Sequence, residues 1–169
     1  IIKICGLDKH AITIDDIVFK IGPRINAAGR MEVDSDDENA APSGGHSAVY
    51  LMVARDEEVA SEYGAFIDTC NQDRKNIDRS ITQEAHDIIE RHPEMKARKS
   101  TVIYNPKWMK GIVGIVASRL IETYYRPTVV LTMSNGFVTG SARSVPGFDL
   151  YQAVESCSDL LENFGAHIY

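Results

Sequence analysis

A long stretch near the middle of the chain repeats apolar residues at helical spacing. From about Asp56 to Arg91 the sequence has no proline and a single glycine, Gly64. The apolar positions recur every three or four residues for much of its length: Val59, Tyr63, Phe66, Ile67, Cys70, Ile77, Ile81, Ala85, Ile88 and Ile89. This spacing predicts one helix with a narrow apolar stripe, about 50 Å long at ~1.5 Å per residue. The pattern favours a partly solvated connecting helix. The alternative is one helix of a coiled-coil dimer, but the stretch contains few clean heptads.

Shorter helices are predicted before this stretch. Their expected ranges are 1–5, ended by Gly6, then 13–20 with Thr13 or Asp15 as the cap, 23–31, and 46–53, which begins at His46 or Ser47. Gly22-Pro23 is expected to end the second of these helices, because proline suits the first turn of a new helix. Residues 32–45, rich in acidic residues and ending in a Pro-Ser-Gly-Gly run, are expected to form a loop.

After Pro93 the pattern changes to short β-branched runs around one apolar helix. The expected elements are a strand at 101–104, a helix from about 111 to 125, strands at 127–132 and 137–139, and a helix from Phe148 or Asp149 through Leu161. This order predicts an α/β fold, with α+β as the alternative, in which helices flank a mixed sheet. We therefore expect three parts: residues 1–55, a connecting helix at 56–92, and a domain at 93–169.

Composition adds two constraints. The 169 residues carry a formal net charge of −6, which argues against nucleic-acid binding over the whole surface. The charge is uneven, however, because residues 1–95 hold 10 basic and 19 acidic residues while residues 96–169 hold 8 and 5. The sequence contains no run of about 18 consecutive apolar residues, the length typical of a membrane span. Three distant cysteines suggest a reducing compartment, so a cytoplasmic location is expected, and a chain that begins with Ile1 is expected to be a segment of a longer protein.

The most suggestive chemistry lies in the segment Gly140-Ser141-Ala142-Arg143-Ser144. Residues two apart on a strand point to the same side, so Ser141 and Arg143 could hold one anion between a hydroxyl and a guanidinium. Gly140 would allow a ligand to approach the backbone, and Ser144 adds a second hydroxyl. The alternative is a β-bulge or a strand end whose arginine pairs with a surface carboxylate.

Two further segments carry similar signals. Arg24, Asn26 and Arg30 bring two cations and an amide into one short helix, around the small residues 27–29. An anion site and a tight helix–helix contact explain this segment equally well. Gly111 and Gly114 lie where a loop becomes a helix, and they suit either an anion at the helix N-terminus or close packing against a sheet.

Three of these motifs, in their order and spacing, resemble the RecJ family of single-strand-specific 5′→3′ DNA exonucleases within the DHH phosphoesterase superfamily. They are the segments 23–31, 111–120 and 140–144, and residues 163–167 resemble the family's Phe-Gly-Gly-His. The resemblance covers nearly all of the chain from about Asp15. Two departures from the family pattern are Met109, where the family usually has His after Trp, and Ala166, where it has a second Gly.

The resemblance implies a role in DNA repair and recombination, with single-stranded DNA as partner. It implies that Ser141 and Arg143 bind the 5′-phosphate with Arg30, and that Gly140, Ser144 and His167 lie near the same cleft. The segment containing Arg24 and Asn26 would hold the DNA backbone. The Asp and His residues that bind Mn²⁺ or Mg²⁺ in the family are not matched here. This segment is therefore expected to hold no metal, to contain no catalytic residue and to be inactive by itself.

Two other functions stay open from the sequence. A DHH-type phosphodiesterase for short oligonucleotides or cyclic dinucleotides would share the glycine-rich C-terminal cleft, but that subfamily resembles the Asn-Ala-Ala-Gly-Arg segment at 26–30 less well. A non-catalytic module that docks other proteins through the long helix is the second alternative, and repair proteins are its possible partners.

Overall fold

The computed structural model describes residues 1–7, 11–31 and 44–165. The chain divides into two compact units, Ile1–Arg79 and Ser80–Tyr169, and the division falls inside one long helix. Each unit has its own buried apolar core. In the described ranges, no helix combines the length and the apolar character needed to cross a bilayer.

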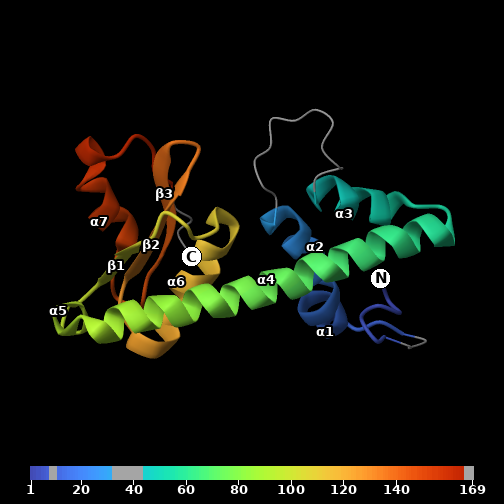
Figure 1. The fold of residues 1–169 in the computed structure, drawn as a ribbon, viewed down its shortest axis with the longest axis horizontal. Coiled ribbons are helices and arrows are strands. Elements are labelled where there is room, and N and C mark those ends of the chain that lie inside the picture. The colour runs from blue at the N-terminus through green and yellow to red at the C-terminus, as the bar shows by residue number, and fades with distance from the viewer. Residues whose placement is uncertain (8–10, 32–43, 166–169) are drawn as a thin grey trace. The chain divides into compact units, whose positions relative to one another are not determined.

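The long helix α4 spans Glu57–Arg91 as one continuous element (Figure 1). Its 35 residues confirm the single helix predicted from the apolar spacing. Asp56 caps its start, because the carboxylate accepts hydrogen bonds from the backbone N–H groups of Glu58 at 2.8 Å and Val59 at 3.1 Å. Pro93 follows its end and opens the short helix α5, Pro93–Lys96, as expected for a residue that fits a first helical turn.

The first unit begins with a turn rather than the expected helix end. Cys5 donates its backbone N–H to the carbonyl of Ile1 at 2.9 Å, which closes a single turn. Gly6 then leaves this turn at a φ of 67°, a left-handed conformation that favours glycine. Gly6 and Leu7 also donate their backbone N–H groups, to the carbonyls of Lys3 and Ile2 at 3.0 Å each, which is the hydrogen-bond pattern of a helix C-terminus at Gly6. Among these three bonds, the one from Cys5 has the four-residue spacing of an α-helix, so the segment forms a turn.

Three helical segments follow without a break, which corrects the expectation that Gly22-Pro23 would end a helix. They are α1 (Ile14–Asp16), the π-helical segment η1 (Ile17–Ile21) and α2 (Gly22–Arg30). Thr13 caps α1 in a reciprocal capping box with Asp16. Gly22 donates its N–H five residues back to Ile17, and this wider turn carries the chain into Pro23, whose ring would clash in a regular helix interior.

Helix α3 (Gly44–Val53) packs closely against α2. A side chain at Gly44 would overlap the carbonyl group of Ala28, so only glycine allows this approach. Ala28 and Ala48 form a core with Ile67 of α4. The small residues of the 27–29 segment therefore serve helix packing at Ala27 and Ala28, both fully buried.

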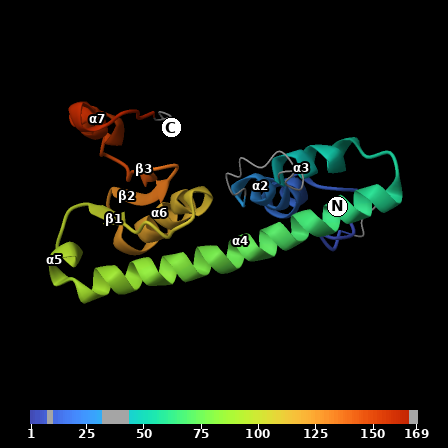
Figure 2. The ribbon, with the colours of Figure 1, turned by 45° about the horizontal axis from the view of Figure 1, so that its top comes forward.

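The second unit contains a three-stranded mixed sheet, which confirms the predicted fold class. Strand β1 (Thr101–Tyr104) pairs parallel to β2 (Thr128–Ser134), which pairs antiparallel to β3 (Phe137–Arg143). Helix α6 (Lys110–Tyr124) connects β1 to β2 and packs against β2 and β3 (Figure 2). Strand β3 continues to Arg143, four residues beyond its predicted end.

The core of this unit lies between the sheet and α6. Ile103 and Val130 face it from the strands, and α6 contributes Ile112, Val116 and Leu120, all of them buried. Three residues of α4 are also buried at helical spacing: Ile81, Ala85 and Ile89. Full burial of each large aliphatic side chain stabilises the fold by about 1.5–3 kcal/mol, which fixes α6 on this face of the sheet.

The last helix is shorter than predicted. Asp149 caps α7 (Leu150–Glu155), as expected, but the helix ends there and only a 3₁₀ turn at Ser158–Leu160 follows. The apolar stripe expected to bury residues up to 161 does not do so, since Leu160 is 79% exposed. Ser156 donates its hydroxyl to the carbonyl of Ala153 at 2.7 Å, a local bond of the kind that competes with helix continuation.

Candidate phosphate-binding site

The side chains of Ser141 and Arg143 share the face of β3 that points toward α6. In the antiparallel pairing, Ser141 lies opposite Val130 and Arg143 opposite Thr128. Both β2 partners are fully buried under α6. Because side chains alternate along a strand, the two-residue spacing places the hydroxyl and the guanidinium on that same side.

Both side chains converge on Gly114 of α6. A Cβ atom at Gly114 would lie 3.2 Å from Ser141 Oγ and 3.3 Å from Arg143 Nη2. The hydroxyl of Ser141 and the guanidinium of Arg143 therefore lie against the surface of α6 at Gly114, which has no side chain to separate them from the helix backbone. We call Gly114, Ser141 and Arg143 the β3–α6 cluster. Glycine at 114 serves close packing of the helix on the sheet, and it also makes room for the two side chains.

The polar atoms of this cluster have few partners. Arg143 Nη1 donates to the carbonyl of the neighbouring Ala142 at 2.8 Å. Across the described ranges no carboxylate pairs with Arg143, and no residue forms a hydrogen bond with the Ser141 hydroxyl. The surface ion pair considered as an alternative is therefore not seen in this part of the chain. A hydroxyl and a guanidinium side by side suit a phosphate group.

Two neighbouring residues of the motif have local structural explanations. A side chain at Gly140 would overlap the carbonyl oxygen of Val130 on β2, so strand packing accounts for this glycine without a ligand. The Ser144 hydroxyl donates to the carbonyl of Phe148 at 2.7 Å and thereby closes the loop that leads to α7.

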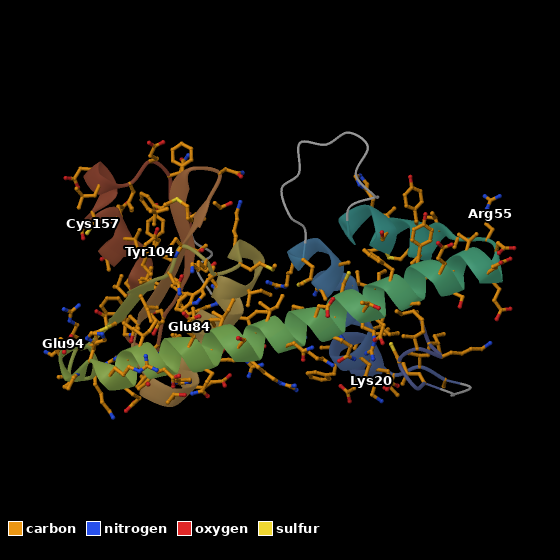
Figure 3. The ribbon with its side chains drawn as sticks, viewed as in Figure 1. Lys20, Arg55, Glu84, Glu94, Tyr104 and Cys157 are labelled. Carbon is orange, nitrogen blue, oxygen red and sulfur yellow. The ribbon has the colours of Figure 1, made fainter. Side chains whose placement is uncertain are left out.

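The loop before α6 is held from two sides, and this fixes where the helix begins. Glu84 of α4, labelled in Figure 3, accepts hydrogen bonds from Asn105 Nδ2 and Trp108 Nε1, both at 2.8 Å. From the sheet, Thr132 donates its hydroxyl to the carbonyl of Trp108. Trp108 itself is 4% exposed. Helix α6 begins two residues later, with Met109 as an N-cap that offers no side-chain hydrogen bond.

Sequence reasoning missed two residues around the cluster. Lys110, exposed at the first position of α6, lies four residues before Gly114, a spacing that places two residues on one face of a helix. Its four-residue spacing from Gly114 was a visible signal. Glu84 gave no such signal, because its contacts reach 21 and 24 residues along the chain.

The other predicted residues lie outside this unit or outside the described residues. Arg24, Asn26 and Arg30 all belong to α2 in the first unit. Arg24 is engaged there, since Nε donates to Asp68 at 2.7 Å and Nη1 to the carbonyl of Lys20 at 2.9 Å. Asn26 and Arg30 are exposed on the helix surface. His167 lies beyond the described residues, as do the acidic positions 32–38.

A metal cage is not apparent in the described part of the chain. No group of three or more His, Cys, Asp or Glu side chains is arranged there to hold a metal ion. The arrangement that the described residues do provide suits binding of an anion.

The fold defines the chain as a helical unit and a small α/β unit that share one long helix. The chain is 35% identical over 169 residues to the single-stranded-DNA-specific exonuclease RecJ of Bacillus subtilis (strain 168), covering 99% of this chain and 20% of that protein. It is 30% identical over 177 residues to RecJ of Dickeya dadantii (strain 3937), covering 99% of this chain and 28% of that protein. No family model matches the chain.

Solved structures give the same result. A crystal structure of RecJ in complex with Mn²⁺ from Thermus thermophilus matches 90% of this chain with a TM-score of 0.73 and 26% identity, over 20% of its own length. A structure of exonuclease RecJ bound to manganese matches 98% of this chain with a TM-score of 0.74. By sequence along nearly its whole length and by fold, the chain is related to RecJ, which confirms the resemblance found in its motifs. It corresponds to a segment of those longer proteins.

Proposed function

We propose that this chain forms the DNA-holding part of a single-strand-specific 5′→3′ exonuclease, in which the β3–α6 cluster binds the 5′-terminal phosphate. The observation that carries the proposal is the convergence of Ser141 and Arg143 on Gly114. A terminal phosphate would accept hydrogen bonds from the hydroxyl and the guanidinium together, and Lys110 would add charge from the start of α6. Charged hydrogen bonds of this kind are about twice as strong as neutral ones.

The residues of α2 have a separate part in the proposal. Arg30 and Asn26 are exposed and would contact the phosphates of the DNA backbone, which fix a strand without reading its sequence. Arg24 would act mainly by holding α2 on α4, since Asp68 and the Lys20 carbonyl already occupy its donors. Gly140, Ser144 and His167 complete the proposed surroundings of the strand.

The proposed reaction is hydrolysis of a phosphodiester by the intact protein. Mn²⁺ or Mg²⁺ would activate the attacking water there, held by residues other than those described here. This segment would contribute position, because a terminal phosphate fixed at one point sets which bond reaches the reacting centre. The segment alone is proposed to be inactive. We propose that the intact protein acts in the repair and recombination of DNA, in the cytoplasm.

The test is a nuclease assay of the intact protein on single strands with and without a 5′-phosphate, in Mn²⁺ and in Mg²⁺. We expect digestion from the 5′ end and a preference for the phosphorylated strand. Digestion from the 3′ end, or equal use of both substrates, would contradict the proposed role of the cluster. Exclusive cleavage of dinucleotides or cyclic dinucleotides would instead identify the related phosphodiesterase, and binding without cleavage would favour a non-catalytic module.

A further inference from the structure

Glu84 links the long helix to the loop that starts α6. Its two carboxylate oxygens accept separate hydrogen bonds, Oε1 from Asn105 Nδ2 and Oε2 from Trp108 Nε1, each at 2.8 Å. Both donors are N–H groups, so the contact needs an acceptor at both oxygens. A carboxylate meets this need, whereas a glutamine of the same shape can accept with its single oxygen only.

The loop has little freedom on its other side. Asn105 donates its backbone N–H to the carbonyl of Leu131 at 3.1 Å, and Thr132 donates its hydroxyl to the carbonyl of Trp108. The Asn105 side chain also accepts from the backbone N–H of Lys107 at 2.9 Å. The loop is therefore fixed between strand β2 and helix α4, and Glu84 supplies the α4 side of that attachment.

The position of this loop matters for the β3–α6 cluster. The first turn of α6 follows directly, since Ile112 and Val113 donate their backbone N–H groups to the carbonyl of Met109. Gly114 comes one residue later. A Cβ atom built there would lie 3.2 Å from Ser141 Oγ and 3.3 Å from Arg143 Nη2, so α6 and β3 are tightly packed at this point. A shift of α6 by a few tenths of an ångström would change how the two polar groups and Lys110 face one ligand.

We propose that Glu84 is a positioning residue for phosphate recognition, which holds the start of α6 in register with Ser141 and Arg143. This inference rests on the proposed function of the cluster. It assigns a role in ligand selectivity to a residue of the connecting helix that does not itself touch the phosphate.

The test compares Glu84→Gln in the intact protein with the wild type, by binding of 5′-phosphorylated and unphosphorylated single strands at one salt concentration. The substitution keeps the shape of the side chain and removes one of its two acceptors. We expect the preference for the phosphorylated strand to fall about tenfold, less than the roughly hundredfold cost of a 1 Å misplacement of a reacting group. Affinity for the unphosphorylated strand should change much less.

A matched control and a direct probe accompany this measurement. Gln83→Ala alters the neighbouring residue, whose amide donates to Asp87 on the exposed side of α4, and should leave the preference unchanged. The ¹⁹F resonance of 5-fluorotryptophan at position 108, assigned by its loss in Trp108→Phe, should shift in Glu84→Gln. If Glu84→Gln melts below the assay temperature, Asn105→Ala tests the same link, because it removes one of the two donors to Glu84.

The outcomes separate this inference from the function on which it rests. A wild type without preference for the 5′-phosphate refutes the proposed function, and the inference with it. A wild type with that preference, and a folded Glu84→Gln variant that keeps it, refutes the inference alone. An equal loss of affinity for both strands also refutes it, because that result shows a role in stability without a role in selectivity.

Discussion

The guanidinium of Arg126 lies over the ring of Tyr124, with its Cζ atom 5.1 Å from the ring centroid. Arg126 is 8% exposed, yet no carboxylate pairs with it in the described part of the chain. Backbone carbonyls and one hydroxyl take its hydrogen bonds instead: Met95 at 3.1 Å, Lys96 at 2.8 Å, Arg98, and Thr101 Oγ1 at 2.8 Å. One cation thus holds the chain between α5 and β1 against the end of α6.

Arg126→Met should destabilise the second unit without touching the β3–α6 cluster. The substitution keeps an unbranched apolar stem and leaves several part-buried carbonyls without their donor, so we expect a loss of about 2–4 kcal/mol. Thermal unfolding of the intact protein, with hydrogen exchange in β1 as a local readout, measures the effect. The control is Arg91→Met, which removes an exposed pair with Asp87 at 3.8 Å and should cost less than about 1 kcal/mol. Equal losses in the two variants would show that the Arg126 contacts contribute little.

The pKa of Glu90 gives a prediction for acid conditions. Its carboxylate accepts hydrogen bonds from Lys96 and from Tyr124, and these bonds hold the pKa below the ordinary value of 4.5. Because the folded pKa is the lower one, the stabilisation is present above pH 4.5 and is lost as the pH falls through the folded pKa. Glu90→Gln should therefore reduce the dependence of melting temperature on pH in this acid range. An unchanged acid slope in the variant would assign the effect to other carboxylates.

The sequence predicts those parts of the fold that depend on local patterns. The apolar spacing from Val59 to Ile89 predicted α4, and the short β-branched runs predicted all three strands. The expected break at Pro23 was wrong because a π-helical turn before it accommodates the ring. The helix expected to reach Leu161 was wrong because its apolar residues remain exposed and local serine bonds compete with the helix. Both outcomes depend on packing and backbone hydrogen bonds, which apolar spacing does not report.

The candidate site was predictable in part, for a similar reason. Alternation along one strand was sufficient to place Ser141 and Arg143 on the same side. Their convergence on Gly114 brings together residues 27 and 29 positions apart, and no local pattern in the sequence fixes that contact. The same limit applies to Glu84, whose role depends on where the loop before α6 meets a helix that ended earlier in the chain. Gly140 shows the converse case, because a glycine interpreted as room for a ligand is accounted for by packing against Val130.

Gly114→Ala should separate helix stability from phosphate recognition. Alanine in a helix interior is favoured over glycine by about 0.8–1 kcal/mol, so the fold should be kept. The added Cβ would press on Ser141 Oγ and Arg143 Nη2, and we expect the preference for 5′-phosphorylated strands to fall about tenfold as both groups move. Binding of both strands measures this change. The control is Ser118→Ala, one turn along α6, whose hydroxyl donates to the backbone carbonyl of Gly114 at 3.2 Å. A more stable Gly114→Ala variant with unchanged preference would show that the cluster tolerates the methyl group.

Arg143→Ala should weaken binding of 5′-phosphorylated single strands more than binding of unphosphorylated ones. Arg143 and Ser141 can supply charge and a hydroxyl to one terminal phosphate, and a hydrogen bond to a charged group contributes roughly 1.5–3 kcal/mol, about ten- to a hundredfold in affinity. The fold should be kept, since Arg143 is exposed and has no carboxylate partner among the described residues. The matched control is Arg98→Ala, which removes the same charge from an exposed position of the same unit. Affinities for both strands have to be compared at one salt concentration, because phosphate contacts are salt-sensitive. An equal loss of affinity for both strands would show that Arg143 contacts the DNA backbone. An unchanged affinity for both strands would show that Arg143 is not part of the binding site.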